Sequence, residues 1–170
     1  MDASLRAGVA VYNAGRFHAA HDAWEDPWLS LDDGTDDERF LHGLIQFTAA
    51  IHHARTRNWS GATGLAESAG DYLSGLPSPY RGVALDPVRR ALSMLAADPE
   101  VIERRRPPPL RHDGAVLTLA DLRFEAAAVA ARVLAAADGY DPAPIDRAVD
   151  FAREEVADGE RTLFTTLVME

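Results

Sequence analysis

The longest uncharged stretch of the chain is the feature that most limits how it can fold. Between Phe40 and Ala54 there are fifteen residues without an Asp, Glu, Lys or Arg, although charged residues make up 26% of the sequence. Apolar residues recur in this stretch with helical spacing. A helix on the surface of an acidic protein would carry acids on its outer face, so we expect a helix that is buried on nearly all sides.

The composition indicates one folded domain with an acidic surface. The chain has 170 residues, of which 47% are hydrophobic, and a net charge of −10. All seventeen basic residues are Arg, a composition that resembles haloarchaeal proteins and favours a halophilic origin. Such a surface repels nucleic acid and anionic membranes, so neither is an expected partner. The absence of Cys excludes disulfides, thiol nucleophiles and zinc sites built on Cys.

The predicted location is the cytoplasm. The N-terminus shows no basic segment followed by an apolar run. No stretch reaches the roughly 18 apolar residues that a membrane-spanning helix needs.

Periodicity and helix-end signals predict an all-α fold, a single-domain bundle of about five to seven helices. We expect Pro27 to end or kink the second helix near Asp26, and a capping box at Thr35 to open the third. Residues 163–168 fit either a short strand or a last helical turn. The expected helices cover residues 2–12, 16–31, 35–57, 58–73, 86–97, 118–137 and 141–156.

Three arginines followed by three prolines, at residues 104–109, give the strongest boundary signal. We therefore predict a helical core domain at 1–103, an Arg/Pro-rich loop at 104–117, and C-terminal helices at 118–170 that pack on the core. The arginines could bind nucleic acid, but no aromatic residues interleave with them. We interpret them as a basic loop that balances an acidic surface.

Candidate functional residues gather on the second and third predicted helices. On a helical wheel, one face of the second helix carries His18, His21, Asp22 and Glu25, beside an aromatic stripe. His21 and Glu25 are four residues apart, so they are neighbours on the helix surface. The aromatic stripe, which is Phe17, Trp24 and Trp28, is interpreted as core, with the wall of an apolar pocket as the alternative.

The third helix carries His42, Gln46 and His53 on one stripe, separated by small residues. Buried polar groups need partners. A short turn joins the second and third helices, so we expect them to be antiparallel neighbours. The natural partners of this stripe are then His18, His21 and Glu25.

Three interpretations of this group remain open. A buried His/Glu/Gln network can simply fix the packing of two helices, which we favour. The same residues could hold a divalent metal, with His21, Glu25 and His53 as ligands. A histidine beside a glutamate could also act as a general base without a metal. Whether the protein is an enzyme is not decided by the sequence.

Two segments, Tyr12–Trp28 and Phe40–Ala62, together resemble the domain-of-unknown-function family 309, whose members are small helical proteins. The resemblance covers roughly residues 10–75. It departs from the family pattern at Asp22, where Glu is usual, and at Arg57, where Gly is frequent. The matching positions are Asn13, Gly15, His21, Glu25, Trp28, Gly43, Gln46, His53, Asn58, Gly61 and Ala62.

The resemblance implies an all-helical fold and assigns no activity. Our leading interpretation is a helical binding or scaffold protein with a buried His/Glu/Gln site between the second and third helices. The alternative is a metal-dependent enzyme, for example a hydrolase, that uses His21, Glu25 and His53. A homodimer or another protein partner could also cover the apolar third helix.

Overall fold

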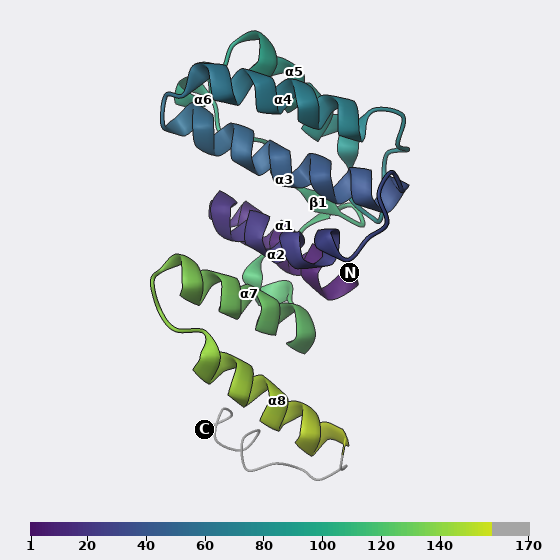
Figure 1. The fold of residues 1–170 in the computed structure, drawn as a ribbon, viewed down its shortest axis with the longest axis vertical. Coiled ribbons are helices and arrows are strands. Elements are labelled where there is room, and N and C mark those ends of the chain that lie inside the picture. Colours follow the sequence, from purple (N-terminus) through teal and green to yellow (C-terminus); the bar gives the residue numbers. More distant parts are fainter. Residues whose placement is uncertain (158–170) are drawn as a thin grey trace.

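The computed structural model describes residues 1–157. Over these residues it contains eight α-helices and one small hairpin, which confirms the all-α prediction (Figure 1). The count exceeds the predicted five to seven because one helix is a single turn. The elements are α1 (Asp2–Asn13), α2 (Phe17–Leu29), α3 (Asp36–Arg55), α4 (Trp59–Leu73), α5 (Leu85–Ala97), α6 (Val101–Arg104), β1 (Arg111–His112), β2 (Ala115–Val116), a 3-10 turn (Leu119–Asp121), α7 (Phe124–Ala137) and α8 (Ala143–Ala157).

The centre of the fold is α3, as the uncharged stretch predicted. Within residues 40–54 only His52 is exposed. Figure 1 shows α3 between α4 on one side and the pair α1 and α2 on the other. Phe40, Phe47 and Ile51 are fully buried between these layers. The apolar surface of α3 is therefore covered within the chain.

The predicted cap at Thr35 is confirmed, and together with a cap at Asn58 it sets the starts of α3 and α4. The hydroxyl of Thr35 accepts a hydrogen bond from the Glu38 backbone N–H at 3.2 Å. The Asn58 side chain accepts one from the Gly61 N–H at 3.1 Å. Each cap satisfies a backbone donor that the first turn of a helix leaves free.

Three predicted boundaries were wrong. Pro27 does not end α2 near Asp26, and the helix continues to Leu29, because a proline in the last turn removes only one backbone hydrogen bond before the helix ends. The helix expected at 118–137 is split, since the Asp121 carboxylate accepts from both the N–H and the hydroxyl of Thr118 and closes a 3-10 turn. α5 begins at Leu85, one residue before the predicted start. Residues 163–168 lie outside the described residues.

The end of α1 holds the segment that follows α6. The Asn13 amide donates to the Leu110 and Leu117 carbonyls at 2.9 Å each, and accepts from the Leu110 N–H at 2.8 Å. The Tyr12 hydroxyl donates to the Pro108 carbonyl at 3.0 Å, and burial raises the pKa of this tyrosine. Both residues tie the Arg/Pro-rich segment to the first helix.

The C-terminal helices continue the stack of layers. α7 packs on α1 and α2, and α8 packs on α7 at the end of the molecule (Figure 1). Of the three arginines at the predicted boundary, Arg104 ends α6 and pairs with Asp98. The division of the chain at residues 103 and 117 remains a prediction.

Candidate functional site

The seam between α2 and α3 brings the predicted polar residues into two groups. The two helices run antiparallel, because Trp28 near the end of α2 faces His42 near the start of α3, with ring centroids 4.6 Å apart. At the other end of the seam, His18 faces His52 at 6.3 Å. The polar side chains therefore follow the helix contact as expected, but they do not converge on one point.

The first group is a hydrogen-bonded row along α3. One carboxylate oxygen of Glu38 receives the Trp28 indole N–H at 2.9 Å and lies 3.1 Å from Nδ1 of His42. The other ring nitrogen of His42, Nε2, lies 3.0 Å from the side-chain nitrogen of Gln46. A carboxylate only accepts, so Nδ1 of His42 donates to Glu38, and Nε2 accepts from the Gln46 amide. Both imidazole nitrogens thus have protein partners.

Aromatic rings hold His42 in place. Tyr72 of α4 lies against the imidazole with a centroid distance of 3.9 Å, opposite the helix that supplies Trp28. The side chain of His42 is 20% exposed and that of Glu38 is 11% exposed. An open hollow of about 710 Å³ adjoins this group and is lined also by Ser68 and Asp71 of α4.

The electrostatics of the row keep Glu38 ionised. Burial by itself would raise the pKa of this carboxyl, because desolvation disfavours the charged form. The hydrogen bonds from Trp28 and His42 act in the opposite direction and outweigh burial, so the pKa lies below its ordinary value. The Gln46 carbonyl oxygen is buried and has no partner among the described residues.

The second group lies on α2 and is more open. Nδ1 of His18 lies 3.2 Å from a carboxylate oxygen of Asp22, and Nε2 of His21 lies 3.9 Å from a carboxylate oxygen of Glu25. One ligand atom from each of His21, Asp22 and Glu25 lies within 4.8 Å of the others. The side chains of His18 and Glu25 are 73% and 48% exposed. One imidazole and two carboxylates are a donor set that suits zinc, iron or manganese.

His53, the third predicted metal ligand, belongs to neither group. Its Nδ1 lies 2.6 Å from the Asn58 amide nitrogen, at the junction of α3 and α4. A Cβ added at Gly61 would lie 2.7 Å from both of these side chains. Three motif positions therefore serve one helix junction, where His53 meets the residue that caps α4 and a glycine leaves the room for both.

The expected partnership across the seam was wrong. Among the described residues, no hydrogen bond or ion pair joins His21 or Glu25 to His42, Gln46 or His53. The partners of the α3 row come instead from Glu38 on the same helix, from Trp28, and from the ring of Tyr72.

Sequence analysis missed Glu38 because it was assigned to the helix cap. Its spacing of four residues before His42 is the signal that could have found it. Tyr72 lies thirty residues further along the chain and has no local signal.

The aromatic stripe of α2 is core for the greater part. Trp24 is fully buried and its indole donates to the Leu5 carbonyl at 3.3 Å. Gly8 makes room for this indole, since an added Cβ would lie 2.1 Å from it. Phe17 is buried under the Arg55 guanidinium, and Trp28 is the residue of the stripe that donates to a side chain, that of Glu38.

Comparison with known families gives a match over the N-terminal part of the chain. Residues 5–65 match the family model described as Domain of unknown function (DUF309). The similarity to this family covers less than half of the chain, and residues 5–65 are called the DUF309 segment below. It spans α1 to the first half of α4, and every motif position named from the sequence falls inside it. No curated protein matches the chain. Within residues 1–157, no helix combines the length and the apolar character that crossing a bilayer requires.

Proposed function

We propose that the chain is a helical binding or scaffold protein, in which the α3 row of the DUF309 segment fixes how α2, α3 and α4 pack. The observation that carries this proposal is the state of His42, whose two ring nitrogens both have protein partners. A general base must reach the proton that it removes, so a catalytic imidazole needs one free edge. His42 offers none.

Other motif residues support a structural role. The Asn13 side chain holds the segment after α6 through three hydrogen bonds to backbone groups, and Asn58 caps α4. Gly43 leaves room for Leu73, since an added Cβ would lie 2.6 Å from that side chain. The motif therefore consists largely of contacts that fix where helices end and how closely they approach.

The tautomer of His42 tests this proposal. At pH 8, nitrogen-15 NMR of the imidazole is expected to show the proton on Nδ1, held by Glu38. His18 provides the internal comparison, because its side chain is 73% exposed whereas that of His42 is 20% exposed. A His42 ring with the proton on Nε2, or one that exchanges as quickly as His18, would contradict the structural role.

The second candidate is a divalent-metal site on α2. The observation that favours it is the approach of one ligand atom each from His21, Asp22 and Glu25. The distances suit a shared ion after a small movement of the exposed Glu25 side chain. In this set Asp22 takes the place that the sequence gave to His53. A metal-dependent enzyme built on these residues remains a proposal.

Metal content tests the second candidate. Protein purified without an affinity tag would be analysed by mass spectrometry for zinc, iron and manganese. Near-stoichiometric metal that is lost in His21→Ala but kept in His52→Ala is the expected result for this site, since His52 lies outside the donor set. Metal-free protein, or an equal loss in both variants, would rule the site out.

Assembly and location remain proposals that rest on the sequence. The apolar surface of α3, which suggested a homodimer or protein partner, is already covered by α2, α4 and α5. A single species of monomer mass in light scattering would remove the dimer proposal. The cytoplasmic location is proposed from the sequence patterns described above, and the high-salt habitat from composition.

A further inference from the structure

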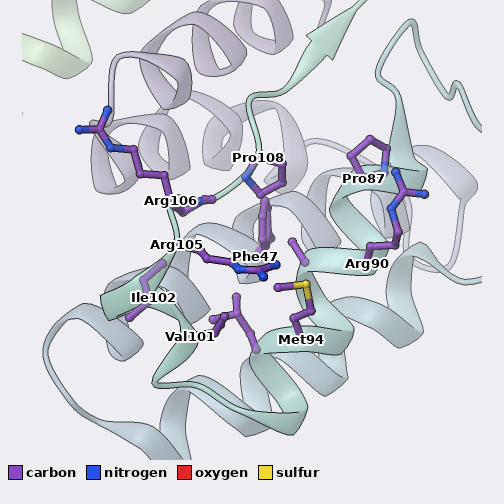
Figure 2. Close-up of a pocket in the computed structure, with 12 residues that line it drawn as sticks. Phe47, Pro87, Arg90, Met94, Val101, Ile102, Arg105, Arg106 and Pro108 are labelled. Carbon is purple, nitrogen blue, oxygen red and sulfur yellow. The ribbon is translucent and has the colours of Figure 1, made fainter.

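A pocket of about 310 Å³ lies outside both polar groups and shares no lining residue with them (Figure 2). Its walls come from α3, α5, α6 and the extended segment that follows α6. Phe47 contributes from α3, Met94 from α5, Val101 and Ile102 from α6, and Pro108 from the extended segment. The lining is therefore mostly apolar.

The charges around this pocket differ from those of the whole chain. The protein carries a net charge of −10, with 27 acidic residues against 17 arginines. The lining nevertheless contains Arg90, Arg105 and Arg106 and no acidic residue. Most other arginines of the described chain pair with a carboxylate, as Arg81 does with Asp37. Within residues 1–157, none of the three pocket arginines has such a partner.

The three arginines point in different directions. Figure 2 shows the guanidinium of Arg105 next to Phe47, across the pocket, and that of Arg90 at the rim beside Pro87. The Arg106 guanidinium points away from the other lining residues. The guanidinium groups of Arg105 and Arg90 therefore adjoin the apolar space. That of Arg106, which follows Arg105 in the chain, does not.

We propose that this pocket binds a small organic carboxylate with an apolar body, attracted by the positive charges of Arg105 and of Arg90 at the rim, and contacted along its body by Phe47 and Ile102. The proposal goes beyond the structural role of the α3 row by naming a ligand class, and it depends on the pocket residues rather than on that row. The volume is at the small end of the range for small-molecule sites. A planar guanidinium can bind both oxygens of a carboxylate, which adds strength and direction.

The two halves of the pocket exclude simpler ligands. An inorganic anion would use the guanidinium groups but would leave the apolar walls in contact with water. A neutral hydrocarbon would bury the apolar walls but would leave the arginines without a counter-ion. A cationic one would also place a like charge beside the arginines. Only a molecule with both features satisfies both halves.

Matched probes test the ligand class. Calorimetric titration of the full chain with octanoate is expected to give saturable binding of one molecule. Octylammonium has the same chain with the opposite charge, and acetate has the same charge without the chain. Both are expected to bind at least tenfold more weakly. Equal binding of octylammonium and octanoate, or no octanoate binding at millimolar concentration, would overturn the proposal.

Substitutions test the assigned residues. Arg105→Met and Arg90→Met keep an apolar side chain but remove the charge, so each is expected to weaken octanoate binding about tenfold or more. Arg106→Met removes the same charge from a side chain that points elsewhere, and it is expected to change binding less than twofold. All three residues are exposed, so thermal unfolding should show that each variant folds.

An equal loss in Arg106→Met and Arg105→Met would show a general effect of net charge and would overturn the assignment. This result is independent of the α3 row. A normal His42 tautomer without octanoate binding would remove only the ligand class, whereas octanoate binding with a freely exchanging His42 would remove only the structural role.

Discussion

The polar rows of α2 and α3 use the same residue types at the same spacing, and yet they differ in nearly every physical respect. His21 and Glu25 on α2 are four residues apart, as are Glu38 and His42 on α3. The α2 pair is separated by 3.9 Å and its glutamate is half exposed, while the α3 pair is 3.1 Å apart and nearly buried. Spacing along a helix places two groups side by side, but the neighbouring helices decide whether they bond.

The cause of the difference lies in what covers each row. Trp28 and Tyr72 pack against His42 from two helices and leave its bond to Glu38 with little exposure. No comparable pair encloses His21 among the described residues. A hydrogen bond shielded from water is electrostatically stronger, and its loss leaves the remaining partner unsatisfied. The α3 row should therefore matter for stability, and the α2 row for ligand binding if it has a role.

The largest expected effect comes from removing the two glutamates one at a time. Glu38→Ala leaves the Trp28 and His42 donors without their acceptor, and we expect it to lower the free energy of unfolding by about 2–3 kcal/mol. Glu25→Ala removes an exposed carboxylate and should change it by no more than about 0.5 kcal/mol. Urea unfolding measures both values, and equal losses would erase the distinction between the rows.

A smaller effect is expected from two glycines of α4, which separate a crowded motif position from an open one. Gly61→Ala places a methyl group against His53 and the capping Asn58, and we expect a loss of about 1–2 kcal/mol. Gly64→Ala meets nothing within 4 Å and should stabilise the helix by about 0.5–1 kcal/mol. Thermal unfolding of both variants measures whether each substitution raises or lowers the stability. A stabilising Gly61→Ala would show that the His53–Asn58 junction is dispensable.

The smallest expected effect is on the pH dependence of stability. The pKa of Glu38 is lower in the folded protein than its ordinary value of 4.5. Its contribution is thus fully present above pH 4.5 and is lost as the pH falls through the lower folded value. Glu38→Gln should flatten this part of the curve, and Glu67→Gln, at an exposed position of α4, should leave it unchanged. An unchanged slope in Glu38→Gln would contradict the shift.

Local signals predicted the fold well where the chain itself supplies the partner. Thr35 and Asn58 cap the helices that their sequences predicted, because a cap involves residues only three positions apart. The uncharged stretch predicted the buried helix, since burial all round excludes charge. Pro27 misled the prediction, because its effect depends on how many residues follow it in the helix.

The candidate site was predicted only in part, because its partners come from elsewhere in the chain. The wheel placed His42 and Gln46 on one stripe, and the structure joins them. The helical wheel could not show that the ring of Tyr72 would pack on His42, nor that the Asn58 amide would lie next to Nδ1 of His53. Likewise, the arginines at residues 104–106 were interpreted as a surface loop, and the position of Arg105 beside an apolar pocket depends on the packing of α5 and α6.

The hydrogen bonds of the Asn13 side chain to residues after α6 affect the order in which the protein can fold during synthesis. Its three hydrogen-bond partners lie 97 and 104 residues further along the chain. During synthesis the ribosome releases the first helix early, but the backbone groups that saturate Asn13 emerge only after α6. In a nascent chain that ends before Leu110, the Asn13 side chain lacks these partners, and the surface of α1 that packs against α7 is uncovered. The packing of α1 is therefore completed only when the later segments have been synthesised.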